Sequence, residues 1–370
     1  MRSLARAYVF ILSVVIALIT TTTITSAQQG PALFPAPNPS GSGWEYISVD
    51  GRPALGGPYA QVRTFSEGFA AVSAVKGQIG YIDQQGNVRI PFKFEDAREF
   101  HEGLAAIKLN GKWGFIDRTG ALVIQPQFED APDWFVDGMS ISVMLPKDLN
   151  TPAPPSFYIR RDGSRVYVQG MDILLPYREG HAWVGKLPRS FLDPTTYQVI
   201  DQFQKPTSPP LTSCGLPGVF SEGLSEFSLG CGKAEQTGYV DHNGHFVIEA
   251  RFSSGLDFSE GFAVVLAGDL YGYIKEDGTF LVKPSFDSAG EFSSGLAQVM
   301  KNGRIGFINS KGEMVISTGL SHSEALAGGF KGELCGIFLL PSPGSKVVRM
   351  EYINKAGEVV FPPTAIPGTN

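Results

Sequence analysis

The chain has 370 residues and a formal net charge of −6, from 30 lysine and arginine residues against 36 aspartate and glutamate residues. This mildly acidic balance argues against nucleic-acid binding, which needs a basic patch or stripe. Beyond the N-terminal segment, no stretch is long and apolar enough to cross a bilayer, so we expect no stable membrane span.

The N-terminus has the organisation of a secretory signal peptide. Arg2 and Arg6 precede an apolar run at 7–19, and small polar residues follow up to Ala27. The run is shorter than the ~20 residues that a spanning helix needs, which argues against a retained membrane anchor. We therefore expect residues 1–27 to be cleaved and the protein to be secreted or periplasmic. No cysteine follows the apolar run, so a lipoprotein anchor is not expected.

Residues 28–43 are rich in proline, glycine and serine, which predicts an extended, mobile linker. A repeat array follows at 44–361, and 362–370 form a C-terminal tail.

Two short elements recur through the array at nearly fixed offsets. The first is aromatic-x-Glu-Gly, as in 100–103 and 258–261. The second is aromatic-Ile-Asp followed by a turn glycine, as in Phe115-Ile116-Asp117 with Gly120. It occurs in nine copies, of which the first and last are incomplete, and we place the fifth at Phe191-Leu192-Asp193. Fixed offsets with variable side chains indicate a stacked structural unit.

One unit contains three short apolar runs in chain order. The first, 104–109, is followed by Asn110-Gly111, a pair typical of a two-residue hairpin turn. The second, 113–117, places Trp113 and Phe115 on one face and Ile116 on the other. After a turn at 118–120, the third run is 122–124. Such a meander is marginal alone and must bury its apolar residues against its neighbours.

We therefore predict an all-β fold, a tandem array of about nine three-stranded meander repeats of ~35 residues each. Because ~35 residues is short for a four-stranded propeller blade, the prediction favours an open solenoid or superhelical array over a propeller-like ring.

The repeated glycines and aspartates are interpreted as structural positions. The aspartate can accept hydrogen bonds from the turn backbone, and the glycine after it is expected to hold a positive φ. The glycines expected to hold a positive φ are Gly86, Gly120, Gly244, Gly278 and Gly312. The structural repeat positions as a whole are Gly68, Gly103, Gly114, Asp117, Gly120, Gly223, Asp241, Gly244, Gly261, Gly278, Gly295 and Gly312.

A glutamate recurs in the first element, once per unit. A row of carboxylates could serve acid–base catalysis or Ca²⁺ binding. An active site needs one special constellation, however, so we interpret these residues as acceptors for backbone N–H groups. They are Glu67, Glu102, Glu179, Glu222 and Glu260.

No constellation predicts catalysis, a cofactor or a metal. Asp241, His242 and His245 form the only local histidine cluster, which is either a weak metal site or, as we favour, a polar turn. The chain contains none of the common hydrolase, metalloprotease or nucleotide-binding motifs. Tryptophans 44, 134 and 183 are interpreted as core or edge aromatics rather than as a platform for sugars.

The three cysteines fall into two groups. Cys214 and Cys231 bracket one Phe-Ser-Glu-Gly element, and in an exported chain they predict a disulfide. Cys335 lies in an apolar run and is expected to be a small buried residue.

The stretch GKWGFIDRTGALVIQPQF at 111–128 resembles the WG-repeat (KWG) family of bacterial proteins. The resemblance extends over about 44–361, although Trp-Gly itself occurs only at Trp113-Gly114. It implies a binding or scaffolding module without a shared reaction.

The spacing between the Glu-Gly element and the next aromatic is 12 or 13 in most units but longer in the fourth, sixth and ninth. These insertions are either drift in tolerant surface loops or functional loops. We predict that 148–155, 231–236 and 341–346 lie on a common rim and contact a partner. The residues assigned to this role are Asp148, Asn150, Pro154, Lys233, Gln236, Ser342 and Lys346.

Together these features predict a non-enzymatic extracytoplasmic protein that binds or scaffolds a protein or a cell-envelope polymer. The alternatives are a carbohydrate-binding or carbohydrate-acting protein of the envelope, and a purely structural surface protein. A non-repeated pair of carboxylates near exposed aromatics would favour the carbohydrate enzyme, and none is evident in the sequence.

Overall fold

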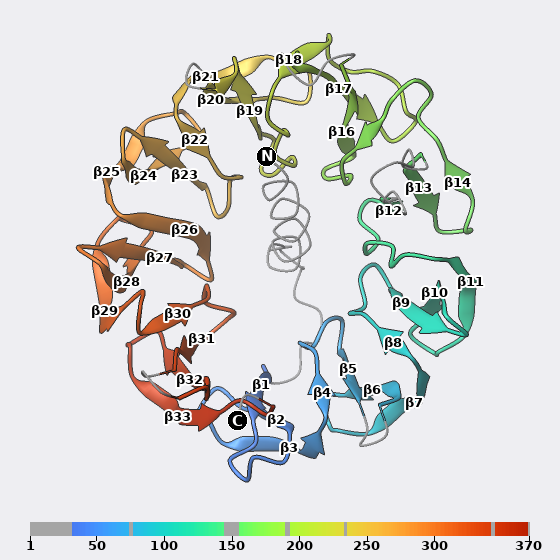
Figure 1. Ribbon diagram of the computed structural model, residues 1–370, viewed down its shortest axis with the longest axis vertical. Helices are drawn as coiled ribbons and strands as arrows, with labels where there is room; N and C mark the ends of the chain where they lie inside the picture. The colour runs from blue at the N-terminus through green and yellow to red at the C-terminus, as the bar shows by residue number, and fades with distance from the viewer. Residues whose placement is uncertain are drawn as a thin grey trace.

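The computed structural model describes residues 32–73, 77–143, 155–188, 193–232, 235–341 and 345–368. Within them, the strands form nine separate antiparallel sheets, and each sheet contains consecutive strands of the chain. The sheets are arranged radially around a common centre (Figure 1). We number them 1 to 9 in chain order.

The first five sheets are built from eighteen strands. Sheets 1 and 2 are β1 (Phe34–Pro37), β2 (Trp44–Ile47), β3 (Pro53–Tyr59) and β4 (Gln61–Val62), β5 (Phe69–Ser73), β6 (Ile79–Asp83), β7 (Val88–Phe94). Sheets 3 and 4 are β8 (Asp96–Ala97), β9 (Leu104–Leu109), β10 (Lys112–Asp117), β11 (Leu122–Phe128) and β12 (Met139–Ser142), β13 (Phe157–Arg160), β14 (Arg165–Val166). Sheet 5 is β15 (Ile173–Leu174), β16 (His181–Lys186), β17 (Thr195–Asp201), β18 (Leu211–Ser213).

The remaining fifteen strands form sheets 6 to 9. Sheets 6 and 7 are β19 (Ser225–Leu229), β20 (Gln236–Val240), β21 (Phe246–Phe252) and β22 (Ser254–Gly255), β23 (Phe262–Ala267), β24 (Leu270–Lys275), β25 (Phe280–Phe286). Sheets 8 and 9 are β26 (Ser288–Ser293), β27 (Leu296–Lys301), β28 (Arg304–Asn309), β29 (Met314–Ser321) and β30 (Ala325–Ala327), β31 (Leu334–Leu339), β32 (Arg349–Asn354), β33 (Val359–Ala365).

Most sheets have four strands, so the prediction of a three-stranded unit is wrong for them. Six of the nine sheets contain four strands among the described residues, and only sheets 1, 4 and 6 contain three. The extra strand is the innermost one, and it is only two residues long in β4, β8, β15 and β22. A single residue, Glu95, separates β7 from β8. Four strands therefore fit into a repeat of about 35 residues, because the innermost strand adds so few residues.

The array is a closed ring, which contradicts the predicted open solenoid. Sheet 1 lies beside sheet 9 in Figure 1, and Phe34, Ala36 and Ile47 share one buried cluster with Tyr352 and Phe361. The Tyr352 hydroxyl donates a hydrogen bond of 2.7 Å to the carbonyl of Pro35, across 317 positions of sequence. Side-chain packing and this hydrogen bond close the ring without a sheet shared between the two ends of the chain.

The same tyrosine contact recurs around the ring, which explains why tyrosine is frequent at the aromatic position of the repeated element. The hydroxyl of each tyrosine donates to a carbonyl of the next sheet, 17 residues further on. The pairs are Tyr46 with Arg63, Tyr81 with Arg98, Tyr158 with Leu175, Tyr239 with Leu256 and Tyr273 with Gly290, at 2.6–2.8 Å. A repeated contact of one geometry gives a constant rotation between neighbours, and a constant rotation can close a ring.

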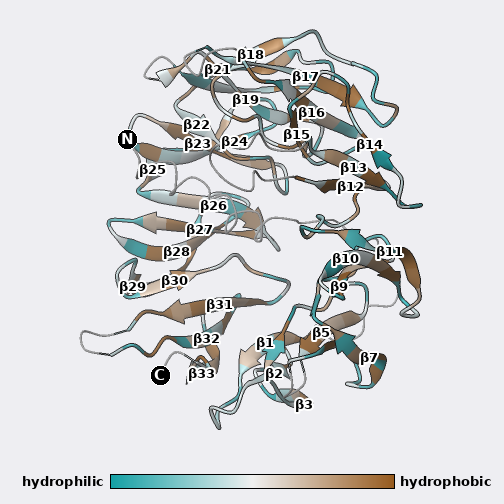
Figure 2. Ribbon diagram, turned by 45° about the vertical axis from the view of Figure 1, so that its right-hand side comes forward, coloured by the Kyte–Doolittle hydropathy of each residue, from teal (hydrophilic) through white to brown (hydrophobic). Residues whose placement is uncertain are grey.

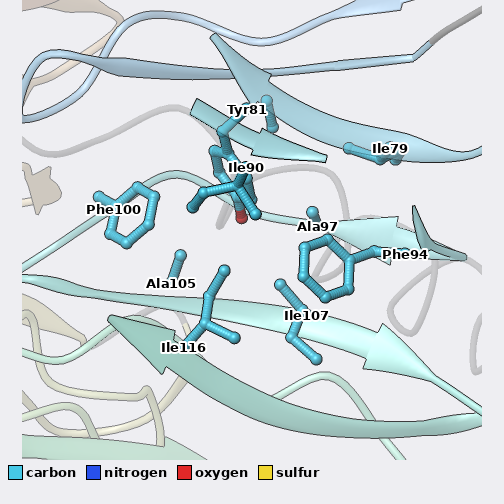
Figure 3. Packing of buried hydrophobic residues seen from close by; sticks show 10 residues of the cluster. Ile79, Tyr81, Ile90, Phe94, Ala97, Phe100, Ala105, Ile107 and Ile116 are labelled. Carbon is cyan, nitrogen blue, oxygen red and sulfur yellow. The ribbon is translucent and has the colours of Figure 1, made fainter. Parts of the chain in front are cut away.

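The core lies mainly between neighbouring sheets. Tyr81, Ile90 and Phe94 of sheet 2 pack against Phe100 and Ile107 of sheet 3 in a buried cluster (Figure 3). Apolar colour follows the strands, while hydrophilic colour is frequent at the turns (Figure 2). Each sheet therefore depends on both neighbours for burial of its apolar residues.

The glycine of the Trp-Gly pair is needed for a close approach of two backbones, whatever residue precedes it. A Cβ on Gly114 would lie 2.5 Å from the Ile124 oxygen and 2.7 Å from the Pro126 nitrogen. The register between β10 and β11 shifts at this point, because β11 bends across the glycine. Gly80, Gly238 and Gly272 show the same close approach, so the glycine recurs although the residue before it varies.

Two predicted boundaries and one predicted repeat copy differ from the structure. β1 lies inside the predicted linker, and its Pro35 and Pro37 are tolerated because β1 is an edge strand. β33 continues through Ala365, into the predicted C-terminal tail. The fifth copy of the second element is predicted at 191–193, of which 191 and 192 lie outside the described residues. In β17 the equivalent residues are Val199-Ile200-Asp201, with valine in place of the aromatic and Gln204, at φ +60°, in place of the turn glycine.

Candidate functional site

The recurring glutamates form a network of hydrogen bonds between the turns of neighbouring sheets. Glu67 Oε2 accepts a hydrogen bond of 2.9 Å from the backbone nitrogen of Gly103 in the next sheet. The links that follow are Glu102 with Gly138, Asp137 with Gly180, Glu179 with Gly223, Glu222 with Gly261, Glu260 with Gly295 and Ser294 with Gly332. We call these seven acceptors the turn network. Through these hydrogen bonds, the recurring carboxylates and Ser294 hold sheets 2 to 9 together.

The turn network uses a backbone conformation that favours glycine. Glu67 and Gly68 have φ values of +52° and +85°, and the same pair of positive values recurs at 102–103, 179–180, 222–223 and 260–261. Two consecutive residues at positive φ are typical of a tight hairpin turn, and a glutamate there is unusual. The contact that each acceptor makes with the next sheet offsets this strain.

The second element also forms turns in which the aspartate side chain accepts hydrogen bonds from the turn backbone, and we call these the capped turns. Asp117 Oδ1 accepts hydrogen bonds from the backbone nitrogens of Thr119 and Ala121, at 2.8 and 3.1 Å. Gly120 has φ +84°, and a Cβ added to it would lie 3.0 Å from Ile90 of the preceding sheet. Gly244, Gly278 and Gly312 also have positive φ values, of +76°, +77° and +81°.

The histidine cluster is part of the junction between sheets 5 and 6. Asp241 Oδ1 accepts hydrogen bonds from the backbone nitrogens of Asn243 and His245. His242 stacks on His181 with ring centroids 4.1 Å apart, and its Nε2 lies 3.3 Å from Glu179 Oε2. Among the described residues, no group of three histidine, cysteine or acidic side chains could hold a metal ion.

The tryptophans and Cys335 lie in packed surroundings. Trp183 is buried, and its Nε1 donates to Ser225 Oγ at 2.8 Å. The rings of Trp134 and His101 contact each other at a tilt, with centroids 4.7 Å apart, and Trp44 packs against the cluster that closes the ring. Cys335 is buried, its thiol contacts the Gly328 carbonyl at 3.0 Å, and burial raises the pKa of the thiol to about 12.

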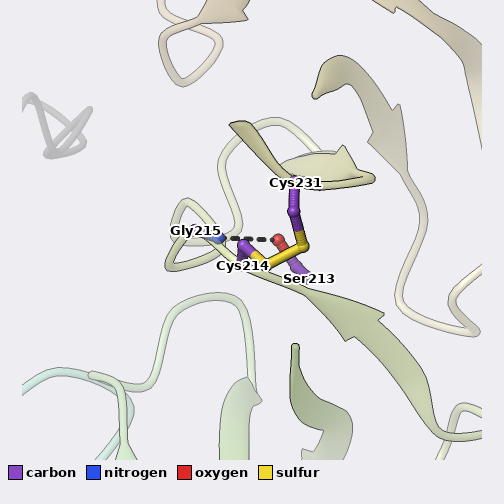
Figure 4. The surroundings of a disulfide bond; sticks show 4 residues. All are labelled: Ser213, Cys214, Gly215 and Cys231. Atoms are coloured by element: carbon purple, nitrogen blue, oxygen red, sulfur yellow. Dashed lines mark hydrogen bonds between the residues drawn. A yellow bond between two sulfur atoms is a disulfide. The ribbon is translucent and has the colours of Figure 1, made fainter. Parts of the chain in front are cut away.

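Cys214 and Cys231 form a disulfide between neighbouring sheets (Figure 4). Cys214 follows β18, the outermost strand of sheet 5, and Cys231 follows β19 of sheet 6 by two residues. The two Cα atoms are 5.4 Å apart. Ser213 Oγ accepts a hydrogen bond of 3.1 Å from the backbone nitrogen of Gly215 beside it.

The three predicted partner loops connect equivalent strands, β12 to β13, β19 to β20 and β31 to β32. Asp148, Asn150, Pro154, Lys233 and Ser342 lie outside the described residues. Gln236 is the exposed first residue of β20 rather than a loop residue, and Lys346 is exposed in the segment before β32.

A group of carboxylates that sequence analysis missed lies on the inner side of sheets 6 to 8. Glu226 belongs to β19 and Glu291 to β26, which are the innermost strands of their sheets, and Asp257 follows the innermost strand β22. Burial raises the pKa of Glu226 and Glu291 to about 7 and that of Asp257 to about 6. The charge of Asp257 raises the pKa of both glutamates further. We call these three residues the inner acidic group.

The inner acidic group breaks the repeat at one identifiable position. Glu226 pairs with Tyr239, whereas the residues opposite the aromatic in sheets 2, 3 and 7 are Ala71, Ala106 and Val264. A carboxylate at a position that sheets 2, 3 and 7 fill with alanine or valine was the available signal. Carboxyl groups whose pKa is shifted far from the ordinary value cluster at functional sites.

Two hollows occur on the described surface. One, of roughly 490 Å³, lies between sheets 4 and 5. At this junction Asp137 stands at the position of the turn-network glutamate, and Gln202 stands at the position of an arginine that pairs with that glutamate in other sheets. Arg118 pairs with Glu67 in the corresponding place, at 2.7 Å. The side chains of Asp137 and Gln202 are shorter than those of glutamate and arginine, so they leave space beside Phe203, which is 68% exposed. The second hollow lies between sheets 6 and 7.

Nine radially arranged antiparallel sheets define the molecule as a nine-bladed β-propeller. Four segments, 79–113, 113–141, 238–271 and 271–304, match the family model described as the WG containing repeat. The resemblance noted in the sequence is thus confirmed at these four repeats.

The chain is similar to a solved structure described as the crystal structure of the eukaryotic initiation factor. The identity is 10% and the TM-score 0.60, over 91% of this chain and 97% of that chain. It is also similar to BamB from Moraxella catarrhalis, at 11% identity and a TM-score of 0.35, over 79% of this chain and 97% of that chain. The first likeness concerns the fold alone. No curated protein matches the chain.

Proposed function

We propose that this chain is a non-enzymatic protein that binds or scaffolds a protein or cell-envelope polymer through the loops that join β12 to β13, β19 to β20 and β31 to β32. The supporting observation is a contrast between two sets of turns. At one end of the strands, the turns are used for contacts between blades. The Glu-Gly turns form the turn network, and the turns capped by aspartate pack against the preceding blade. The loops at the other ends of the strands depart in length from the repeat in blades 4, 6 and 9.

The arrangement of the blades supports a single binding rim. The three longer loops join equivalent strands of blades that share one orientation around the ring. Equivalent connections in such a ring emerge on the same side. Loops carried by a rigid scaffold are where binding residues concentrate.

Shortening the longer loops should weaken partner capture and leave the fold intact. We expect replacement of 148–155 and 341–346 by two-residue turns, with 232–235 shortened so that Cys231 and Gln236 are retained, to change stability little. The amount of partner captured from an envelope extract by the immobilised protein should fall at least tenfold. Quantitative mass spectrometry of the captured material measures this, with circular dichroism as the check of folding.

The matched control alters the opposite ends of the strands. Glu276 and Lys311 are exposed in capped turns of blades 7 and 8, and Glu276→Ser with Lys311→Ser should leave capture unchanged. Wild-type capture by the trimmed protein would contradict the proposal, as would an equal loss in the control.

We also propose that the protein acts outside the cytoplasm, because Arg2, Arg6 and the apolar run at 7–19 have the organisation of a signal peptide. No helix among the described residues is long and apolar enough to cross a membrane. N-terminal sequencing of the protein isolated from its host should begin near Gln28. An intact Met1 on membrane-bound protein would overturn this expectation.

A further inference from the structure

The hollow between blades 6 and 7 has a chemistry of its own. It has a volume of roughly 640 Å³ and is lined by Arg251 and Phe252 of β21 and by Phe280 and Lys283 of β25, with Gly278 between them. Both strands are the outermost strands of their sheets, so the hollow lies on the outer wall of the ring.

The lining contains two cations and no carboxylate. Arg251 Nη2 donates a hydrogen bond of 2.6 Å to the carbonyl of Gly278, and the guanidinium lies over the Phe252 ring at 4.9 Å. These contacts fix the arginine without neutralising it. Lys283 is exposed, and neither cation forms an ion pair with another residue in the part of the chain that the structure describes.

The two aromatic rings offer an apolar surface beside the charges. Phe252 is buried, while Phe280 remains 37% exposed. The ring centroids lie 6.1 Å apart in an edge-to-face arrangement. An exposed aromatic at the margin of a cationic hollow can contact a flat apolar group while the cations contact an anion.

The presence of two cations at one junction departs from the repeat. In blade 2, Lys93 lies over Phe94 at 5.2 Å, as Arg251 lies over Phe252. The position of Lys283 in β25, however, corresponds to Pro91 in blade 2, Gln125 in blade 3 and Ser317 in blade 8. The cation over the phenylalanine therefore recurs as a packing device, and Lys283 is the addition specific to this junction.

We propose that this hollow binds an organic anion whose carboxylate or phosphate group is attached to an aromatic ring. The anionic group pairs with Lys283 and with the free edge of the Arg251 guanidinium, and the ring packs on Phe280. The inference does not rest on the proposed function, because it concerns the outer wall rather than the loops of blades 4, 6 and 9.

Titration of the folded protein with two probes tests the proposal. Phenyl phosphate and benzoate, followed by NMR, separate the two possible sources of the anion, and binding by either supports the site. We expect the better probe to bind at least tenfold more tightly than benzyl alcohol, which lacks the charge, and than inorganic phosphate, which lacks the ring. Lys283→Gln combined with Arg251→Gln should weaken binding at least tenfold, and Phe280→Ala should weaken it as well.

The matched control is Lys93→Gln, which removes the equivalent cation in blade 2 and should leave binding unchanged. Lys283→Gln alone keeps the hydrogen bond from Arg251 to Gly278, so its weaker binding cannot arise from loss of that contact. The proposal is overturned if neither probe binds or if the double variant binds as the wild type does. Equal loss in Lys93→Gln, or inorganic phosphate binding as tightly as phenyl phosphate, would also overturn it.

Discussion

Replacing Cys214 and Cys231 by serine should lower the free energy of unfolding by about 3 kcal/mol. The two cysteines are 17 positions apart, and their bond closes a loop that contains the turn at Glu222-Gly223 and strand β19. In the chain-entropy account, opening a loop of this size restores freedom mainly to the unfolded chain. Both cysteines are exposed, so serine removes the bond without leaving a buried polar group.

The effect should concentrate at the junction of blades 5 and 6. Because each blade contacts only its neighbours, a lost cross-link weakens the nearest interface first. We expect faster hydrogen exchange in β18 and β19 of the variant, and little change in β9 and β10, which lie in blade 3. Denaturation with and without a reductant measures the stability difference, and reduced wild type should match the double variant.

Cys335 provides the internal check. Its thiol is buried, so it should react with an alkylating agent only after unfolding. If Cys214 and Cys231 are alkylated in the native, unreduced protein, or if the double variant keeps the wild-type denaturation midpoint, the disulfide does not stabilise the junction.

The repeat and its local geometry could be predicted from sequence because they depend on neighbouring residues. Asn110-Gly111 forms the expected tight turn, with φ values of +53° and +77°. Trp113 and Phe115 lie in one buried cluster and Ile116 in another, as the alternation in β10 predicts. Offsets within one unit determine these features, so no distant part of the chain is needed to predict them.

Closure of the ring could not be predicted in this way. It depends on the rotation between blades, which the packing of whole interfaces sets, and on the contact of Tyr352 with Pro35 at the two ends of the chain. The short innermost strands were missed for a related reason. Two residues such as Asp96-Ala97 carry no periodicity, and they become a strand only by pairing with β9.

The inner acidic group was missed because no single residue in it is unusual for a strand or a turn. Glu226, Asp257 and Glu291 lie in three different blades, and only the fold brings them to one side of the ring. Their sequence signal is a departure from the repeat, such as glutamate where Ala106 stands in blade 3. Such a departure is informative only once the register of the strands is known.

Glu226→Gln should make the protein more stable at pH 8, by about 1–3 kcal/mol. Burial is the main reason that the pKa of Glu226 rises to about 7, and the charges of Asp257 and Glu235 act in the same direction. Hydrogen bonding from Ser228 Oγ, at 3.1 Å, opposes the rise. The ionised carboxylate is thus disfavoured in the folded chain, and glutamine keeps an oxygen that can accept from Ser228.

The sign of the pH dependence follows from proton binding. Between the ordinary pKa of 4.5 and about 7, the folded state holds a proton on Glu226 that the unfolded state has released. The contribution of Glu226 to stability therefore falls as the pH rises through this window. Glutamine does not titrate, so the stability difference between the variant and the wild type should be near zero at pH 4 and reach its full value at pH 8.

Urea denaturation of both proteins at pH 4, 6 and 8 measures this difference. Glu249→Gln is the matched control, since Glu249 is exposed on β21 of the same blade and its replacement should change stability by less than about 0.5 kcal/mol at every pH. A variant less stable than the wild type at pH 8, or a difference that does not change with pH, would show that Glu226 is ionised and well paired in the folded state. The expected result would instead show that the ring retains a destabilising carboxylate on its inner side, at a position where blades 2, 3 and 7 place alanine or valine. Retention at that cost is characteristic of residues kept for function rather than for folding.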